Sequence, residues 1–89
     1  MSLIDEARLK INAIDEKMVK LFEERMAAVL DVLKYKKEHN LAVFDSKREE
    51  EIIKKNVELL SDSNLKEYYL EFFKAVLSSS KKYQEDHYE

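Results

Sequence analysis

The residues best placed to do chemistry in this sequence are two cations, Arg25 and Lys36, which interrupt apolar stripes of a single helical pattern. Apolar residues recur at spacings of three and four from about residue 3 to about residue 37, which predicts a helix face that packs against a partner. Arg25 stands within this stripe, and Lys36 ends a neighbouring stripe. A cation in such a place needs an anionic partner. We interpret that partner as a small carboxylate ligand.

Arg25 and Lys36 are close enough in register to act on one ligand. They are eleven residues apart, so on a helix they point within about 20° of each other and lie roughly 16 Å apart along the axis. Their long side chains can lean into one shared space. Two plainer interpretations stay open: Arg25 could pair with a glutamate of a neighbouring helix, and Lys36 could be favoured near a helix carboxyl end by the helix dipole.

Arg8 belongs to the same helical pattern but cannot reach the same ligand from its own chain, because about 25 Å of helix separates it from Arg25. If two copies of this helix pack antiparallel and cross near residue 19, Arg8 of one chain comes level with the midpoint between Arg25 and Lys36 of the other. The alternative is that Arg8 is an ordinary exposed arginine near the start of a helix.

Further polar residues gather at two other places in the chain. Asp45, Arg48 and Glu49 stand where a second helix should begin, although an acidic cap and a following acid are also ordinary at a helix start. Ser80 and Gln84 lie one turn apart on a face made otherwise of aromatic and aliphatic residues. A buried glutamine must satisfy two donors and an acceptor, through either a neighbouring backbone or a ligand.

Several kinds of chemistry are excluded by composition. The chain has no cysteine and no glycine, so it has neither a thiolate metal site nor a glycine-rich phosphate loop. His39 and His87 are too isolated for a metal site, and no serine is accompanied by a plausible histidine base for covalent catalysis. We therefore expect no cofactor and no metal.

The elements that must position these residues are all helical. Tight hairpins between strands depend on glycine and asparagine, and glycine and proline are both absent. We expect an all-α, three-helix chain that forms one domain over residues 1–89. The expected helices cover roughly residues 3 to 38, Asp45 or Ser46 to Leu60, and Leu65 to Tyr83 or beyond.

Local signals define the helix ends and the buried face of the last helix. Asn40 can adopt the left-handed conformation that ends the first helix, and Ser46 with Glu49 has the spacing of a capping box. The buried face predicted for the third helix consists of Tyr69, Phe72, Phe73, Val76 and Leu77.

The length of the first helix predicts a dimer. It should extend on the order of 53 Å, whereas a compact chain of 89 residues has a radius of gyration of only about 12 Å. A second copy packed antiparallel would cover the helix and supplement a core that is marginal at this size. The net charge of -3 argues against nucleic-acid binding, and the lack of a long apolar run or a leader pattern argues against a membrane and for a cytoplasmic protein.

Taken in order, these positions resemble the all-helical chorismate mutase family, the type II chorismate mutase domain. The resemblance extends over almost the whole chain, with one departure at Ala42, where many relatives have proline. The matching residues are Arg8, Asp15, Glu24, Arg25, Met26, Lys36, Val43, Phe44, Asp45, Arg48, Glu49, Ser80, Tyr83 and Gln84.

The resemblance implies an intertwined antiparallel homodimer with shared active sites, and chorismate as its substrate. Arg25 and Arg8 of the partner subunit would hold the two carboxylates, and Lys36 and Gln84 would donate to the ether oxygen. The remaining expected substrate contacts divide between the ring hydroxyl and the carboxylate end. They are Glu49 and the backbone at Asp45 for the hydroxyl, and Arg48 and Ser80 for the carboxylate.

Two other functions compete with chorismate mutase. An isochorismate pyruvate lyase of the same fold would use a similar set of cations, and the loop around residues 37–44 would matter most for the difference. A non-catalytic helical dimerisation or regulatory module would need none of them. Association with another enzyme of aromatic biosynthesis stays open, because the sequence carries no signal for or against it.

Overall fold

The described part of the chain folds into three α-helices and one short 3-10 helix. The computed structural model describes residues 1–88, in which there is no strand, so the all-α prediction is confirmed. The elements are α1 (Leu3–Glu38), α2 (Ser46–Glu58), η1 (Ser63–Leu65) and α3 (Lys66–Asp86).

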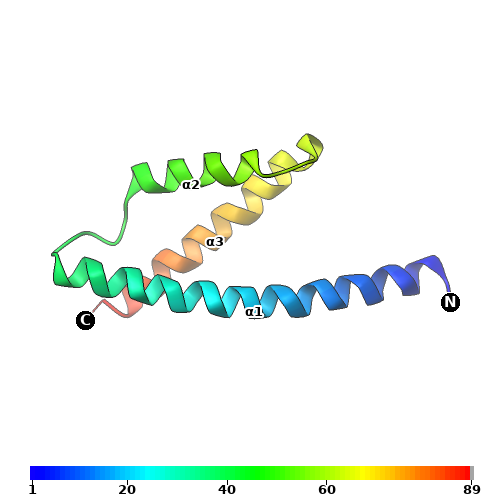
Figure 1. Cartoon of the computed structure of the whole chain (residues 1–89), viewed down its shortest axis with the longest axis horizontal. Helices are drawn as coiled ribbons and strands as arrows, with labels where there is room; N and C mark the ends of the chain where they lie inside the picture. Colours follow the sequence, from blue (N-terminus) through cyan, green and yellow to red (C-terminus); the bar gives the residue numbers. More distant parts are fainter. Residues whose placement is uncertain (89) are drawn as a thin grey trace.

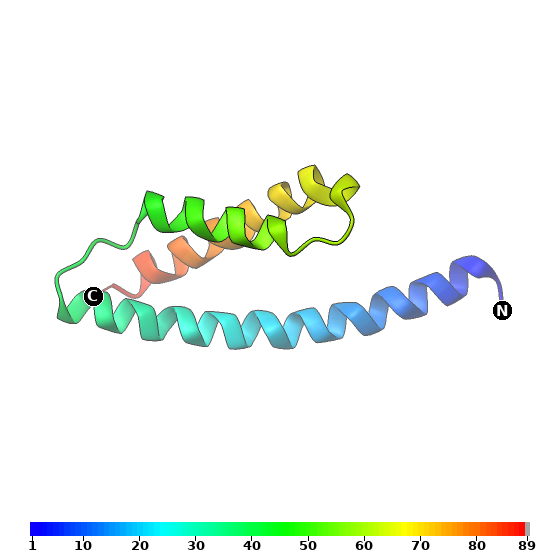
Figure 2. The ribbon, with the colours of Figure 1, turned by 45° about the horizontal axis from the view of Figure 1, so that its top comes forward.

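Helix α3 joins the other two helices. It contacts both α1 and α2, whereas no Cα atoms of α1 and α2 come within 8 Å of each other. Both views show α3 running obliquely along the carboxyl-terminal part of α1, while the amino-terminal third of α1 extends beyond the other helices (Figures 1 and 2). The molecule is therefore elongated, with a long axis of 56 Å and a radius of gyration of 16.3 Å, against about 12 Å for a compact chain of this length.

Side-chain and backbone caps end α1 at the predicted places. The hydroxyl oxygen of Ser2 accepts from the Asp5 amide at 3.2 Å. At the other end Asn40 has a φ of 54°, and the Leu41 amide donates to the Lys36 carbonyl at 2.8 Å. This is the Schellman arrangement with asparagine in the position that glycine usually occupies, and it confirms the role predicted for Asn40.

The start of α2 differs from the predicted capping box. Asp45 is the N-cap, and its carboxylate accepts from the Arg48 amide at 3.1 Å. Ser46 is therefore already inside the helix, and the box between Ser46 and Glu49 is wrong. Because the Asp45 carboxylate accepts from the free Arg48 amide at the helix start, the Glu49 side chain is not needed for a capping box. Helix α2 also ends at Glu58, before the predicted residue 60.

The apolar core of a single chain is thin. Leu33 and Phe73 are the buried apolar side chains, at 3% and 5% exposure. Phe72 is 49% exposed, so its assignment to the buried face is wrong for a single chain. The predicted packing stripe on the amino-terminal part of α1 is also uncovered, and its members Ile11 and Ile14 are 53% and 54% exposed. In the described residues, no helix has the length and apolarity needed to cross a bilayer.

The left-handed residue at the end of α1 generates a stability prediction. Asn40→Ala should lower the free energy of unfolding by about 1 kcal/mol, because alanine adopts this conformation at a steric cost. Asn40→Gly should retain the wild-type value. Chemical denaturation at one fixed protein concentration measures both, with the exposed helical substitution Glu38→Ala as a control that changes little. Equal stabilities of the alanine and glycine variants would contradict the prediction.

Candidate functional site

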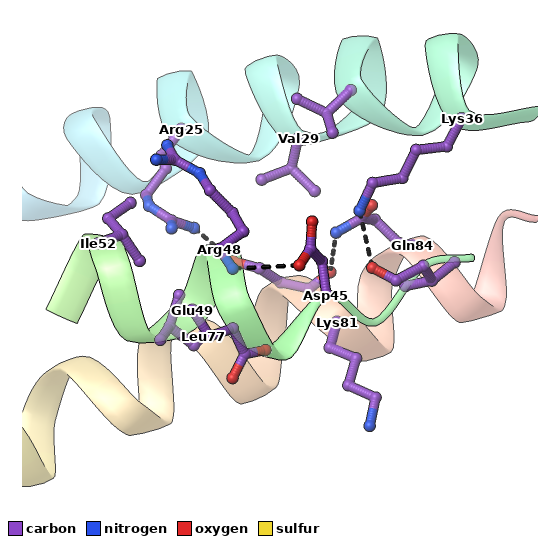
Figure 3. A pocket seen from close by; sticks show the side chains of 13 residues that line it. Arg25, Val29, Lys36, Asp45, Arg48, Glu49, Ile52, Leu77, Lys81 and Gln84 are labelled. Carbon is purple, nitrogen blue, oxygen red and sulfur yellow. Dashed lines mark hydrogen bonds between the residues drawn. The ribbon is translucent and has the colours of Figure 1, made fainter. Parts of the chain in front are cut away.

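A cavity of about 170 Å³ lies between the carboxyl-terminal half of α1, the start of α2 and the end of α3. Figure 3 shows Arg25 and Lys36 reaching from α1 into the same space, with Asp45 and Arg48 of α2 facing them. The cavity is lined by Arg25, Val29, Val32, Lys36, Val43, Asp45, Arg48, Glu49, Ile52, Leu77, Ser80, Lys81 and Gln84.

The structure brings together seven of the eight residues named from the sequence. Arg25, Lys36, Asp45, Arg48, Glu49, Ser80 and Gln84 all border this cavity. Arg8 does not border it, because Arg8 is exposed and lies about 25 Å of helix away from Arg25 on α1. Within one chain, Arg8 is therefore separated from the other seven.

Arg25 is held in place by α3. Its guanidinium Nη1 donates to the Ser80 hydroxyl, which in turn donates to the Val76 carbonyl at 2.9 Å. The guanidinium carbon also lies 5.9 Å from the centre of the Phe73 ring, within the range of a cation–π contact. Ser80 is only 5% exposed. This buried hydroxyl accepts the hydrogen bond that fixes the direction of the Arg25 side chain.

Lys36 is directed by the loop that follows its helix. Its ammonium donates to the Val43 carbonyl at 2.7 Å, and the residue is half-buried. An ammonium has three donors, so two of them are available to a ligand in the cavity. Lys36 does lie in the last turn of α1, where the helix dipole favours a cation. The dipole alone, however, does not account for the direction of its side chain toward the loop.

Gln84 is buried and incompletely satisfied. Its side chain is 8% exposed, and its amide nitrogen donates to the Ser80 carbonyl at 3.4 Å. Its carbonyl oxygen Oε1 has no hydrogen-bond partner within the described chain. A neighbouring backbone therefore satisfies only part of this amide, which leaves one N–H and the oxygen for a ligand.

The charges around the cavity favour an anion. Three cations, Arg25, Lys36 and Arg48, line it against the two acids Asp45 and Glu49, and a fourth, Lys81, borders it with its ammonium over the Phe44 ring. In residues 1–88, none of these four cations has a carboxylate oxygen within 4.0 Å. The alternative in which Arg25 pairs with a glutamate is thus wrong for the single chain. Arg25 and Lys36 are half-buried, and partly buried cations without an anionic partner are costly unless a negatively charged ligand joins them.

Sequence reasoning missed the apolar walls and one cation. Val29 and Val32 stand four and seven residues after Arg25, on the same helical face, so the spacing could have identified them. Ile52 and Leu77 could be recognised only as apolar residues of the helix faces. Lys81 carried no signal, because a lysine near the end of a helix is ordinary.

The chain is similar to a known protein family and to a bifunctional enzyme. The family described as chorismate mutase type II matches residues 7–85. The bifunctional chorismate mutase/prephenate dehydratase of Buchnera aphidicola subsp. Acyrthosiphon pisum (strain APS) is 38% identical over 74 residues, which are 82% of this chain and 19% of that protein. The chain thus spans about a fifth of that relative's length. No solved structure was found to match the chain.

The geometry of the cavity predicts that it binds small dicarboxylates. Adipate should bind the wild-type protein, and Lys36→Met should weaken binding roughly tenfold or more, because a hydrogen-bonded charge is lost. Lys34→Met is the matched control, since this exposed lysine lies two residues away on the other side of α1. Titration followed by NMR chemical shifts measures the affinities. Equal weakening by both substitutions would indicate non-specific attraction and contradict the prediction.

Proposed function

The chain belongs to the type II chorismate mutase family, and on that premise we propose that it is an isomerase that rearranges chorismate to prephenate in phenylalanine and tyrosine biosynthesis. The observation that carries the proposal is the group of cations around one cavity that lack a carboxylate partner within the described chain. Chorismate carries two carboxylates, so it matches the excess of positive charge.

The proposed reaction suits the residues at hand. The rearrangement is an intramolecular pericyclic step, so it requires no nucleophile and no cofactor. The enzyme has to hold the substrate in a compact conformer by fixing both carboxylates. Negative charge then gathers on the ether oxygen as its bond to the ring breaks. Donors placed at that oxygen stabilise the transition state more than the bound substrate.

We assign the substrate carboxylates to Arg25 and to Arg8 of the partner subunit. The hydrogen bond from Arg25 to Ser80 supports this role, because it orients the guanidinium before the substrate arrives. Lys36 and Gln84 are assigned to the ether oxygen. Lys36 keeps two donors beyond its bond to Val43, and the Gln84 amide keeps one N–H. Each such donor would contribute on the order of 2 to 4 kcal/mol.

The start of α2 is assigned to the other end of the substrate. Glu49 and the backbone at Asp45 would bind the ring hydroxyl, and Arg48 with Ser80 would line the carboxylate end. The cap of α2 supports this assignment, because Asp45 rather than Ser46 accepts the first amide and Glu49 is left to face the cavity. The valines and leucine of the wall would exclude water, which strengthens the electrostatic contacts.

The proposed enzyme is an intertwined antiparallel homodimer with two shared sites. The exposed apolar stripe on the amino-terminal part of α1 supports it, since a second copy of α1 would cover that stripe. An antiparallel crossing near residue 19 would carry Arg8 to the partner's cavity. The relative named above carries a chorismate mutase and a prephenate dehydratase in one protein, so we also propose that this chain works beside an enzyme that consumes prephenate.

The first test is turnover of chorismate. Wild type should convert chorismate to prephenate, while Arg25→Ala and Lys36→Ala should each lower kcat/KM by roughly 100-fold or more. Sedimentation should show both variants to have the oligomeric state of the wild type. Lys20→Ala, on the exposed opposite side of α1, is the control with unchanged activity. Isochorismate is offered in parallel, and salicylate as the only product would reject the mutase in favour of the lyase.

The second test asks whether two chains share a site. Inactive Arg8→Ala and inactive Arg25→Ala chains are mixed in equal amounts and allowed to exchange subunits. Each mixed dimer would hold one intact pocket, so about a quarter of the wild-type sites should return. Exchange is verified separately by mass spectrometry of isotope-labelled chains. If exchange is complete and activity does not return, the assignment of Arg8 to the partner's site is wrong.

A further inference from the structure

The loop between α1 and α2 forms one wall of the cavity. Two residues of this loop, Val43 and Asp45, line the cavity. Phe44 lies between them in the sequence and is 48% exposed. The chain has neither glycine nor proline, so no proline ring restricts this loop. Side-chain contacts therefore help to hold its position, beside the backbone hydrogen bond from the Leu41 amide to the Lys36 carbonyl.

Lys81 supplies such a contact from α3. Its ammonium lies 4.5 Å from the centre of the Phe44 ring, a distance typical of a cation–π interaction. Figure 3 shows the Lys81 side chain pointing away from Lys36, so its ammonium is not directed at the centre of the cavity. Lys81 thus contacts the loop rather than the space in which a ligand would sit.

The neighbouring lysine, Lys82, makes a different contact. Lys82 forms an ion pair with Asp86, four residues later, at 3.0 Å. Lys81 has Glu85 at the same spacing, yet these two residues form no ion pair. The Lys81 ammonium lies over Phe44 instead.

Packing alone does not fix the Phe44 ring. A second cavity, of about 350 Å³, borders the ring between α2 and α3, and Ile53 and Leu77 form its apolar wall. Because one side of the Phe44 ring borders this space, fewer packing contacts hold the ring on that side. The contact with Lys81 therefore matters more for the position of the ring. Movement of Phe44 would displace the adjacent Val43 carbonyl, which accepts the hydrogen bond from Lys36 at 2.7 Å.

We propose that Lys81 is a positioning residue: by holding Phe44, it keeps the Val43 carbonyl where it orients the Lys36 ammonium toward the cavity. This inference rests on the proposed function, because Lys36 there acts on the ether oxygen. Lys81 touches neither the substrate nor Lys36. Its loss should therefore affect the transition state more than substrate binding.

The experiment compares Lys81→Met, Phe44→Leu, the double variant and Lys81→Arg with wild type. Methionine keeps an unbranched apolar side chain but removes the charge, whereas arginine keeps the cation–π contact. Lys82→Met is the matched control, because it removes the charge of the next lysine. Two readouts are taken: kcat and KM with chorismate, and backbone NMR order parameters of Val43 and Phe44 in the ligand-free protein.

Lys81→Met should lower kcat roughly two- to tenfold and change KM less than about twofold, with lower order parameters in the loop. Phe44→Leu should match it, the double variant should lose no more than either single variant, and Lys81→Arg should retain wild-type kcat. Lys82→Met should leave both readouts unchanged.

Three results would overturn the inference. They are unchanged order parameters in Lys81→Met, an unchanged kcat with a raised KM, or losses that multiply in the double variant. If wild type does not convert chorismate, the proposed function fails, and the order parameters still decide separately whether Lys81 holds the loop.

Discussion

Cations that have no carboxylate partner in the described residues dominate the site of this protein. The side chains of Arg25 and Lys36 extend from α1 into one cavity. Each donates a hydrogen bond to a neutral oxygen, Arg25 to the Ser80 hydroxyl and Lys36 to the Val43 carbonyl. Neutral acceptors orient a cation but do not neutralise it. The chain thus holds positive charge in a fixed direction, with no carboxylate of the described residues beside it.

Each helix serves this arrangement in a different way. Helix α1 sets the spacing of Arg25 and Lys36, and α3 provides Ser80 as the acceptor for Arg25 and Gln84 as a partly satisfied amide. The Asp45 cap at the start of α2 leaves Glu49 free to face the same space. Polar residues therefore occupy buried positions that apolar residues would fill in a more stable core, which is the usual conflict between a site and stability.

The thin core and the bare stripe of α1 have one physical origin. A helix of 36 residues is too long for the other two helices of an 89-residue chain to cover. The exposed isoleucines Ile11 and Ile14 and the distant Arg8 lie on the same exposed stretch of α1. In the proposed dimer, a single act of association would bury the stripe and complete the pocket, so stability and activity would depend on the same contact.

Periodicity, caps and spacing are local properties, so the sequence was enough to predict the helices, the end of α1 at Asn40 and the resemblance to a family. Tertiary structure alone decided that Asp45 and not Ser46 caps α2, that Phe72 stays exposed in one chain, and that Lys81 lies over Phe44 instead of pairing with Glu85. The local sequence offers two candidate caps for α2 and two candidate contacts for Lys81. Which contact forms depends on which group is brought within reach when α3 packs against α1 and α2.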